Sequence, residues 1–192
     1  AWDQRQMETV QALMPTLKNY PLYPYLEYRQ LTDDLMNQPA LVVTNFIAAN
    51  PTLPPARSLK SRFVNELARR DDWRGLLAFS PEKPTGTEAQ CNYYYAKWNV
   101  GQTQEAWDGA KALWLSGKSQ PNACDRLFGA WRASGQQDPL AYLERIRLAM
   151  KAGNTSLVRV LAQQMPSDYQ TIATAVIALA NDPNSVMTFA RT

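Results

Sequence analysis

The residue types that most often carry enzyme chemistry are scarce in this chain and do not form a recognisable site. Its 192 residues include no histidine and only two cysteines, Cys91 and Cys124. The absence of histidine removes the commonest general base, the Ser/His and Cys/His nucleophile pairs, and most zinc sites. The spacing of the cysteines excludes a C-x-x-C redox motif. We therefore expect neither a metal nor a cofactor.

Adjacent carboxylates occur at Asp33–Asp34 and at Asp71–Asp72. Neighbours in sequence do not face each other across a substrate, whereas a glycosidase requires two carboxyl groups about 5 to 10 Å apart or one in a desolvated pocket. Both pairs lie near predicted helix ends or turns, where acidic residues cap helices and remain solvated. Phosphate-binding loops of the G-x-G-x-x-G or G-x-x-x-x-G-K type are missing from the sequence. The sequence therefore predicts no catalytic residue.

Two clusters leave a binding role open. Basic side chains gather around a predicted amphipathic helix: Arg57, Lys60, Arg62, Arg69, Arg70 and Arg74. This cluster is either a solvated helix face or a contact surface for an acidic polymer or partner domain, with Arg57, Arg62 and Arg69 as contact residues. Aromatic side chains form a second group: Tyr93, Tyr94, Tyr95, Trp98, Trp107, Trp114 and Trp131. Their helical spacing favours a core between helices over a sugar-stacking platform, and the same interpretation applies to Tyr20, Tyr23, Tyr25 and Tyr28.

Helical patterns run through the whole chain and indicate a repeat. Gly101 and Gly135 lie 34 residues apart, and each separates two helical patterns. This spacing is typical of helix–turn–helix repeats, in which stacked pairs share one core. Alternating strand pairs with Asn-Gly or Asp-Gly turns are absent from the sequence. We predict an all-α fold, a right-handed superhelix (α-solenoid) of irregular, TPR-like helix pairs with about ten or more short helices, forming a single domain over residues 1–192.

Local signals place several helix ends. The prolines of NPTLPP (50–55) are interpreted as a rigid connector before a helix from 57 to 70. Thr87 with Gln90 predicts a capping box, and Asp138 before Pro139 predicts an N-cap. The run TIATAVIALA (171–180) is predicted to be a buried helix because it lacks alternation. A last short helical pattern follows at VMTFA (186–190).

Composition and charge limit the class of protein. Hydrophobic residues make up 45% of the chain and the formal charge is +3, which is globular and too mildly basic to suggest nucleic acid. No run approaches the roughly 18 apolar residues of a membrane span. The start at Ala1 suggests a mature exported form or a trimmed piece.

In an exported chain, cysteines at nearly equivalent repeat positions favour a disulfide between Cys91 and Cys124 over two buried free thiols. Cys91 lies ten residues before Gly101, and Cys124 lies eleven before Gly135. Equivalent positions in a stack of repeats are neighbours. A bridge between them would stabilise the fold by about 3 to 4 kcal/mol through loop closure.

Four segments resemble the soluble lytic murein transglycosylases of Gram-negative bacteria: PLYPYLEYRQLTDDLMNQP, NPTLPPARSLKSRFVNELARRDDWRGLLAFSPEKP, TEAQCNYYYAKWN and DPLAYLERIRLAMKAGN. The resemblance runs through essentially the whole chain. It implies a periplasmic protein whose N-terminal region is a U-shaped superhelix of short helices. In this family the superhelix closes with a linker domain into a ring that carries a lysozyme-like catalytic domain.

The resemblance also implies a function for the parent enzyme. Such an enzyme cleaves the β-1,4 bond between N-acetylmuramic acid and N-acetylglucosamine without water, leaving a 1,6-anhydromuramic product, and uses one glutamate as acid and then base. The family's E-S-x-W-N and G-L-M-Q-I type motifs are absent from this sequence, so no residue inherits the catalytic role. The resemblance carries over the scaffold and the disulfide between Cys91 and Cys124.

We therefore expect a non-catalytic arm that shapes the ring around a peptidoglycan glycan strand and is inactive alone. The alternative is a stand-alone helical-repeat module that docks a periplasmic cell-wall protein, because concave helical stacks commonly serve as binding surfaces.

Overall fold

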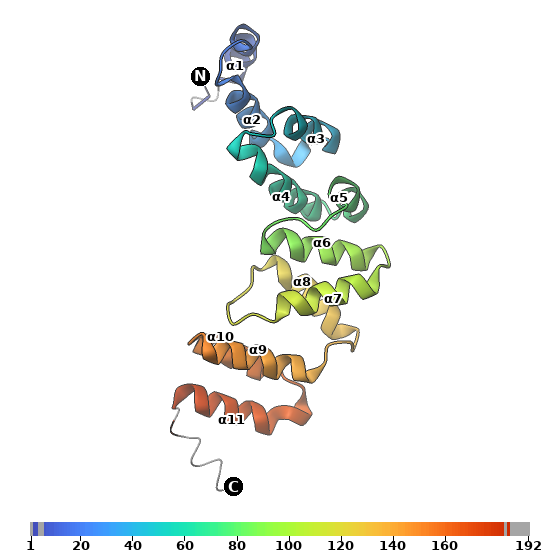
Figure 1. The fold of residues 1–192 in the computed structure, drawn as a ribbon, viewed down its shortest axis with the longest axis vertical. Coiled ribbons are helices and arrows are strands. Elements are labelled where there is room, and N and C mark those ends of the chain that lie inside the picture. Colours follow the sequence, from blue (N-terminus) through green and yellow to red (C-terminus); the bar gives the residue numbers. More distant parts are fainter. Residues whose placement is uncertain (1, 4–5, 183, 185–192) are drawn as a thin grey trace. The chain divides into compact units, whose positions relative to one another are not determined.

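The computed structural model describes residues 2–3, 6–182 and 184, and this part of the chain is helical without strands (Figure 1). It contains eleven α-helices and three short 3-10 helices, which confirms the predicted all-α class and helix number. The chain divides into two compact units, Ala1–Pro84 and Thr85–Thr192, which are described separately. No helix in the described ranges has both the length and the apolar character needed to cross a bilayer.

Unit 1 is built around one long amphipathic helix. Its elements are α1 (Met7–Leu13), η1 (Met14–Leu17), α2 (Tyr23–Asp33), η2 (Leu35–Asn37), α3 (Ala40–Ala49), α4 (Pro54–Arg69) and α5 (Trp73–Phe79). Helix α4 packs against both α3 and α5. It places Leu59, Phe63 and Val64, all fully buried, on one face, as the helical spacing of these apolar residues requires.

The predicted proline connector is shorter than expected. Pro54 and Pro55 form the first turn of α4 instead of preceding it. Proline is tolerated there because the N–H groups of a first turn have no partner within the helix and because its fixed φ suits helical backbone. The prediction that all of NPTLPP lies outside the helix is wrong for this reason.

Unit 2 is a succession of packed helices. Its elements are α6 (Thr87–Asn99), α7 (Thr103–Trp114), α8 (Ala123–Ala133), α9 (Pro139–Lys151), α10 (Thr155–Gln163), η3 (Ser167–Tyr169) and α11 (Gln170–Asn181). Helix α6 packs against α7 and α8, and α10 packs against α9 and α11. The run TIATAVIALA is helical as predicted, although Ala173 is its one fully buried residue. The expected pattern at 186–190 lies outside the described residues.

Gly101 and Gly135, whose spacing indicated a repeat, lie just after the first helix of each of two successive pairs. Gly101 follows α6 with φ +87° and Gly135 follows α8 with φ +71°, a left-handed backbone that glycine adopts without steric cost. The Gly101 N–H reaches the Trp98 carbonyl at 3.0 Å. The spacing of 34 residues therefore reflects two consecutive helix pairs, α6–α7 and α8–α9, as predicted.

The two predicted N-caps have different outcomes. The Asp138 carboxylate accepts a hydrogen bond from the Leu140 N–H at 2.8 Å, with Pro139 in the first turn, so this cap is confirmed. The N-cap of α6 is Gly86, with φ +86°, and not Thr87. The turn into α6 needs a left-handed residue, which glycine supplies, and Thr87 then takes a helical backbone. The capping box prediction is wrong.

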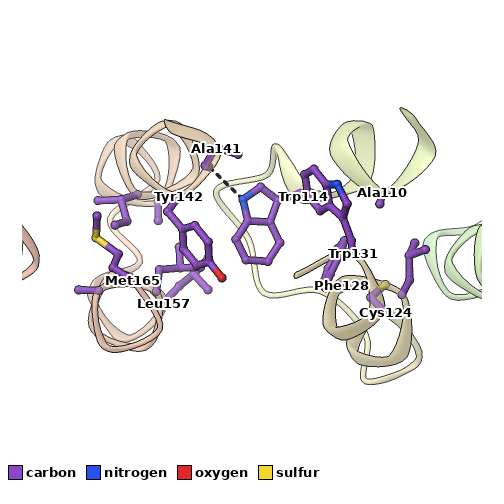
Figure 2. Packing of buried hydrophobic residues seen from close by; sticks show 14 of the residues in the cluster. Ala110, Trp114, Cys124, Phe128, Trp131, Ala141, Tyr142, Leu157 and Met165 are labelled. Carbon is purple, nitrogen blue, oxygen red and sulfur yellow. Dashed lines mark hydrogen bonds between the residues drawn. The ribbon is translucent and has the colours of Figure 1, made fainter. Parts of the chain in front are cut away.

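The core of unit 2 centres on Trp114 (Figure 2). Its ring centroid lies 5.0 Å from that of Phe128 and 5.1 Å from that of Tyr142, both edge to face, an arrangement that aromatic pairs prefer. The indole N–H donates to the Ala141 carbonyl at 2.9 Å. Trp114 therefore joins α7 to α8 and to the start of α9.

The interpretation of the aromatic residues as core is confirmed in unit 2 but not throughout unit 1. Four are buried: Tyr93, Trp107, Trp114 and Trp131. The others in this group pack half-buried against them: Tyr94, Tyr95 and Trp98. In unit 1, Tyr20 is 65% exposed and Tyr25 is 43% exposed, contrary to the prediction. Tyr20 precedes α2, and Tyr25 lies on a different face of α2 from its buried residue Leu31, so neither reaches a core.

Two helical glycines predict opposite responses to substitution. A Cβ at Gly109 in α7 would lie 2.3 Å from Cδ1 of the Tyr94 ring, so Gly109→Ala should lower the free energy of unfolding by about 1 to 3 kcal/mol. A Cβ at Gly129 in α8 meets nothing within 4 Å, so Gly129→Ala should raise the free energy of unfolding by about 0.5 to 1 kcal/mol. Urea denaturation of both variants tests this, and stabilisation by both would contradict the close packing of α7 on Tyr94.

Candidate functional site

The two cysteines are joined. Cys91 of α6 and Cys124 of α8 form a disulfide with an S–S distance of 2.01 Å, and both are fully buried, which confirms the predicted bridge. Because α6 and α8 are the first helices of successive pairs, the bond links equivalent positions of neighbouring repeats. Neither sulfur is available as a nucleophile, since a buried disulfide carries no thiolate.

The predicted capping role is confirmed for one of the paired carboxylates, Asp72. Asp72 is the N-cap of α5, where its carboxylate accepts from the Gly75 N–H at 2.9 Å. Asp34 accepts from the Asn37 side-chain amide at 2.7 Å, and Asp33 accepts from the indole of Trp2. The bonds of Asp72 and Asp34 are local, whereas that of Asp33 reaches a residue 31 positions away, and all three support a structural role.

The three arginines proposed as contact residues are all exposed on α4, but the structure brings only two of them together. Arg62 and Arg69 lie seven residues apart and so share a helix face, whereas Arg57 lies roughly 140° around the helix from Arg62. Arg62 donates to the Tyr28 hydroxyl, and its guanidinium lies 5.9 Å from the Tyr28 ring centroid. Arg69 pairs with Glu66.

A neighbouring arginine has a structural role that the sequence did not reveal. Arg70 donates to the carbonyls of Leu35 at 2.8 Å and Gln38 at 3.2 Å, at the end of η2. Its guanidinium also lies 5.3 Å from the Phe63 ring centroid. The carbonyls are 35 and 32 residues away in sequence, so no local pattern distinguishes Arg70 from the other arginines.

An open pocket of about 550 Å³ lies on unit 2, lined by residues of α7, α8, α9 and α10 and of the segment before α8. Trp114, Phe128 and Leu157 supply apolar walls. Three charged residues line it as well: Asp125, Arg132 and Arg145. The pocket is within the size range of small-molecule sites.

Arg145 is the buried charge of this pocket. The residue is 4% exposed, and its guanidinium carbon lies 4.2 Å from the Trp114 ring centroid. Burial lowers the pKa of Arg145 to about 10, so the side chain remains a cation at neutral pH. Its Nε has no hydrogen-bond partner among the described residues. Cation–π contacts with the Trp114 and Phe128 rings stabilise this charge.

Arg145 was not among the predicted site residues, although its spacing along the chain distinguishes it. Arg145 lies four residues after Ala141 and four before Ala149, and both alanines are buried. Positions four apart share a helix face, so this spacing places Arg145 on the buried side of α9. A cation on the apolar face of a helix is uncommon unless it is paired, so this spacing marks Arg145 as a candidate site residue.

Comparison with known proteins confirms the resemblance found in the sequence. The chain is 80% identical over all 192 residues to the soluble lytic murein transglycosylase of Escherichia coli (strain K12), and 78% identical to that of Salmonella typhimurium. It spans 30% of the length of each of these relatives. No family model matches the chain.

Solved structures agree with the sequence comparison. The fold matches the 70-kDa soluble lytic transglycosylase of E. coli with a TM-score of 0.95 and 80% identity over 100% of this chain and 31% of that one. It matches an inactive mutant of the lytic transglycosylase Slt of Pseudomonas aeruginosa with a TM-score of 0.82 and 35% identity, over 94% of this chain and 29% of that one. The whole chain is therefore similar to a segment that makes up somewhat less than one third of the length of each soluble lytic murein transglycosylase compared.

Proposed function

We propose that this chain is a non-catalytic scaffold segment of a soluble lytic murein transglycosylase. The observation that carries the proposal is 80% identity over every residue of the chain to a protein more than three times as long. The parent enzyme would cleave the bond between N-acetylmuramic acid and N-acetylglucosamine to release 1,6-anhydromuropeptides. Its catalytic glutamate would lie outside this chain, which lacks the E-S-x-W-N type motif.

Local structure supports a scaffold role. Asp72 caps α5, Asp33 and Asp34 accept hydrogen bonds from other side chains, and the disulfide and the aromatic core hold the helix pairs of unit 2 together. A disulfide persists in an oxidising compartment, which fits a location in the periplasm. Within the parent enzyme, residues 1–192 would act as one helical domain that helps shape a ring around the glycan strand.

An activity assay on the isolated chain tests this proposal. Purified chain incubated with peptidoglycan sacculi should release no 1,6-anhydromuropeptide detectable by mass spectrometry, because the catalytic acid is missing. The E. coli enzyme provides the positive control under the same conditions. Release by the chain above the level of heat-denatured protein would overturn the assignment as non-catalytic.

Contact between α4 and the polymer is a separate proposal with its own test. Reversing Arg57, Arg62 and Arg69 to glutamate should reduce the fraction of chain that sediments with sacculi, because attraction to an acidic polymer is lost. The matched control reverses Lys111, Arg147 and Lys151, three exposed cations of unit 2, for the same change in net charge. If both variants lose the same fraction of sedimenting chain, or if neither loses any, the arginines of α4 form a solvated helix face and not a contact surface.

A second role is favoured by the apolar side chains that unit 1 exposes. Leu41 is 69% exposed and Leu22 is 63% exposed, in addition to Tyr20. Such residues suit a protein partner of the cell wall better than a sugar polymer. Cross-linking in periplasmic extract, with and without Leu41→Ser and Leu22→Ser, would support this role if a specific adduct disappears in the variant.

A further inference from the structure

Gly129 differs from the other glycines that lie outside left-handed turns. A Cβ added at Gly75 would lie 2.0 Å from the Asp72 carboxylate, and one added at Gly109 would lie 2.3 Å from the Tyr94 ring. A Cβ added at Gly117 would lie 2.4 Å from the Leu148 carbonyl oxygen. A Cβ added at Gly129 would meet nothing within 4 Å, although glycine inside a helix costs about 1 kcal/mol relative to alanine. Close packing therefore explains the first three glycines and not the fourth.

The open space beside Gly129 belongs to the pocket that contains Arg145. A side chain at position 129 would extend into that pocket, so glycine there keeps it wide. Arg145 forms none of the ion pairs within the described part of the chain, and its Nε is buried without a partner. A buried charge is costly unless it is paired, and the rings of Trp114 and Phe128 offset only part of that cost.

Charges around the pocket narrow the class of ligand. Arg132 adds a second cation among the lining residues, and the Asp125 carboxylate interacts electrostatically with Arg145 without forming an ion pair within the described residues. Asp125 would repel a multiply charged anion such as phosphate. In a ligand with a single negative charge, the Asp125 carboxylate could accept a hydrogen bond from an N–H group next to the ligand's anionic group. A ligand with one carboxylate and neighbouring N–H donors matches both the positive charges and the negative charge that line the pocket.

We propose that this pocket binds the carboxylate of a short peptide. The planar guanidinium of Arg145 would take the carboxylate, because its fork of N–H donors matches carboxylate geometry. Asp125 would accept from a peptide N–H or ammonium group, and Trp114 and Phe128 would contact an apolar side chain. The volume of about 550 Å³ suits a ligand of this size. The inference stands on this pocket alone and not on the proposed scaffold function.

Calorimetric titration of the oxidised full chain tests the proposal with matched probes. Alanyl-alanine should bind at least about tenfold more tightly than its C-terminal amide, which lacks the carboxylate, because a charge-assisted pair is worth at least about 1.4 kcal/mol. Gly129→Leu should weaken dipeptide binding by a similar factor, because its side chain fills the pocket. Arg145→Gln should do the same if the variant folds, and Gly129→Leu carries the test if it does not.

Arg147→Gln is the control variant. Arg147 lies on the same helix, is exposed and pairs with Glu144 at 2.6 Å, and it does not line the pocket. Its substitution should leave dipeptide affinity unchanged. Equal affinities for the acid and the amide, no detectable binding of either, or full affinity in the folded Gly129→Leu variant would each overturn the proposal. Arg145 would then be a structural residue of the core.

A second titration, with cell-wall peptides as the ligand, identifies the source of the peptide. Soluble 1,6-anhydromuropeptides carry peptides with free carboxylates, so tighter binding of these than of alanyl-alanine would assign the pocket to cell-wall peptides. Equal or weaker binding would assign it to free peptides, and both outcomes support a carboxylate site. A failure of all probes leaves the scaffold proposal untouched, because that proposal is tested by product release.

Discussion

Replacement of both Cys91 and Cys124 by alanine is expected to lower the free energy of unfolding by about 3 to 4 kcal/mol. The bond joins residues 33 apart in sequence, so opening it restores the freedom of a long loop to the unfolded chain. Both side chains are fully buried, and the small alanines leave the packing between α6 and α8 otherwise in place. Urea denaturation of the wild type and the double variant measures the difference.

Reductant supplies the control for this experiment. Dithiothreitol should destabilise the wild type by a similar amount once the bond is opened in the unfolded state, and it should leave the double alanine variant unchanged. A loss below about 1 kcal/mol in the variant would show that the bridge adds little beyond the contacts around it.

Trp114→Ala is the second substitution with a large expected effect, a loss of about 3 to 5 kcal/mol. The side chain is 2% exposed and contacts aromatic rings from α8 and α9 (Figure 2). Its removal leaves a large cavity, breaks the indole hydrogen bond to the Ala141 carbonyl and removes the ring beneath Arg145. Thermal or urea denaturation measures the loss, followed by the fluorescence of the remaining tryptophans, of which Trp98, Trp107 and Trp131 lie in unit 2.

Two further variants separate the contributions at Trp114. Trp114→Phe keeps an aromatic ring and removes the N–H donor, so it should cost less than Trp114→Ala while still losing the indole hydrogen bond to the Ala141 carbonyl. Trp98→Ala removes a half-buried indole at the edge of the same cluster and should also cost less. An equal loss from Trp98→Ala and Trp114→Ala would contradict the central position of Trp114.

Features with local signals could be predicted from the sequence. Gly101 and Gly135 mark helix ends because a left-handed residue is needed there, and their spacing correctly indicated equivalent positions for Cys91 and Cys124. Asp138 before Pro139 likewise correctly predicted the start of α9. In each case the physical cause lies within a few residues, so the one-dimensional pattern contains it.

Features set by tertiary contacts could not be predicted in the same way. The exposure of Tyr20 depends on which faces of unit 1 find a partner, and the role of Arg70 depends on carbonyls of η2. Helical angles could have separated Arg57 from Arg62 and placed Arg145 on the buried face of α9. The pocket beside Gly129 needed the structure, because its lining comes from several helices.

The central claim is that this chain serves as the scaffold segment of a soluble lytic murein transglycosylase. The most direct measurement replaces the matching segment of the E. coli enzyme, 80% identical over 192 residues, with this chain and assays release of 1,6-anhydromuropeptides from sacculi. We predict that the chimera is folded and releases product at a rate comparable to that of the E. coli enzyme. A folded chimera without turnover would contradict the claim.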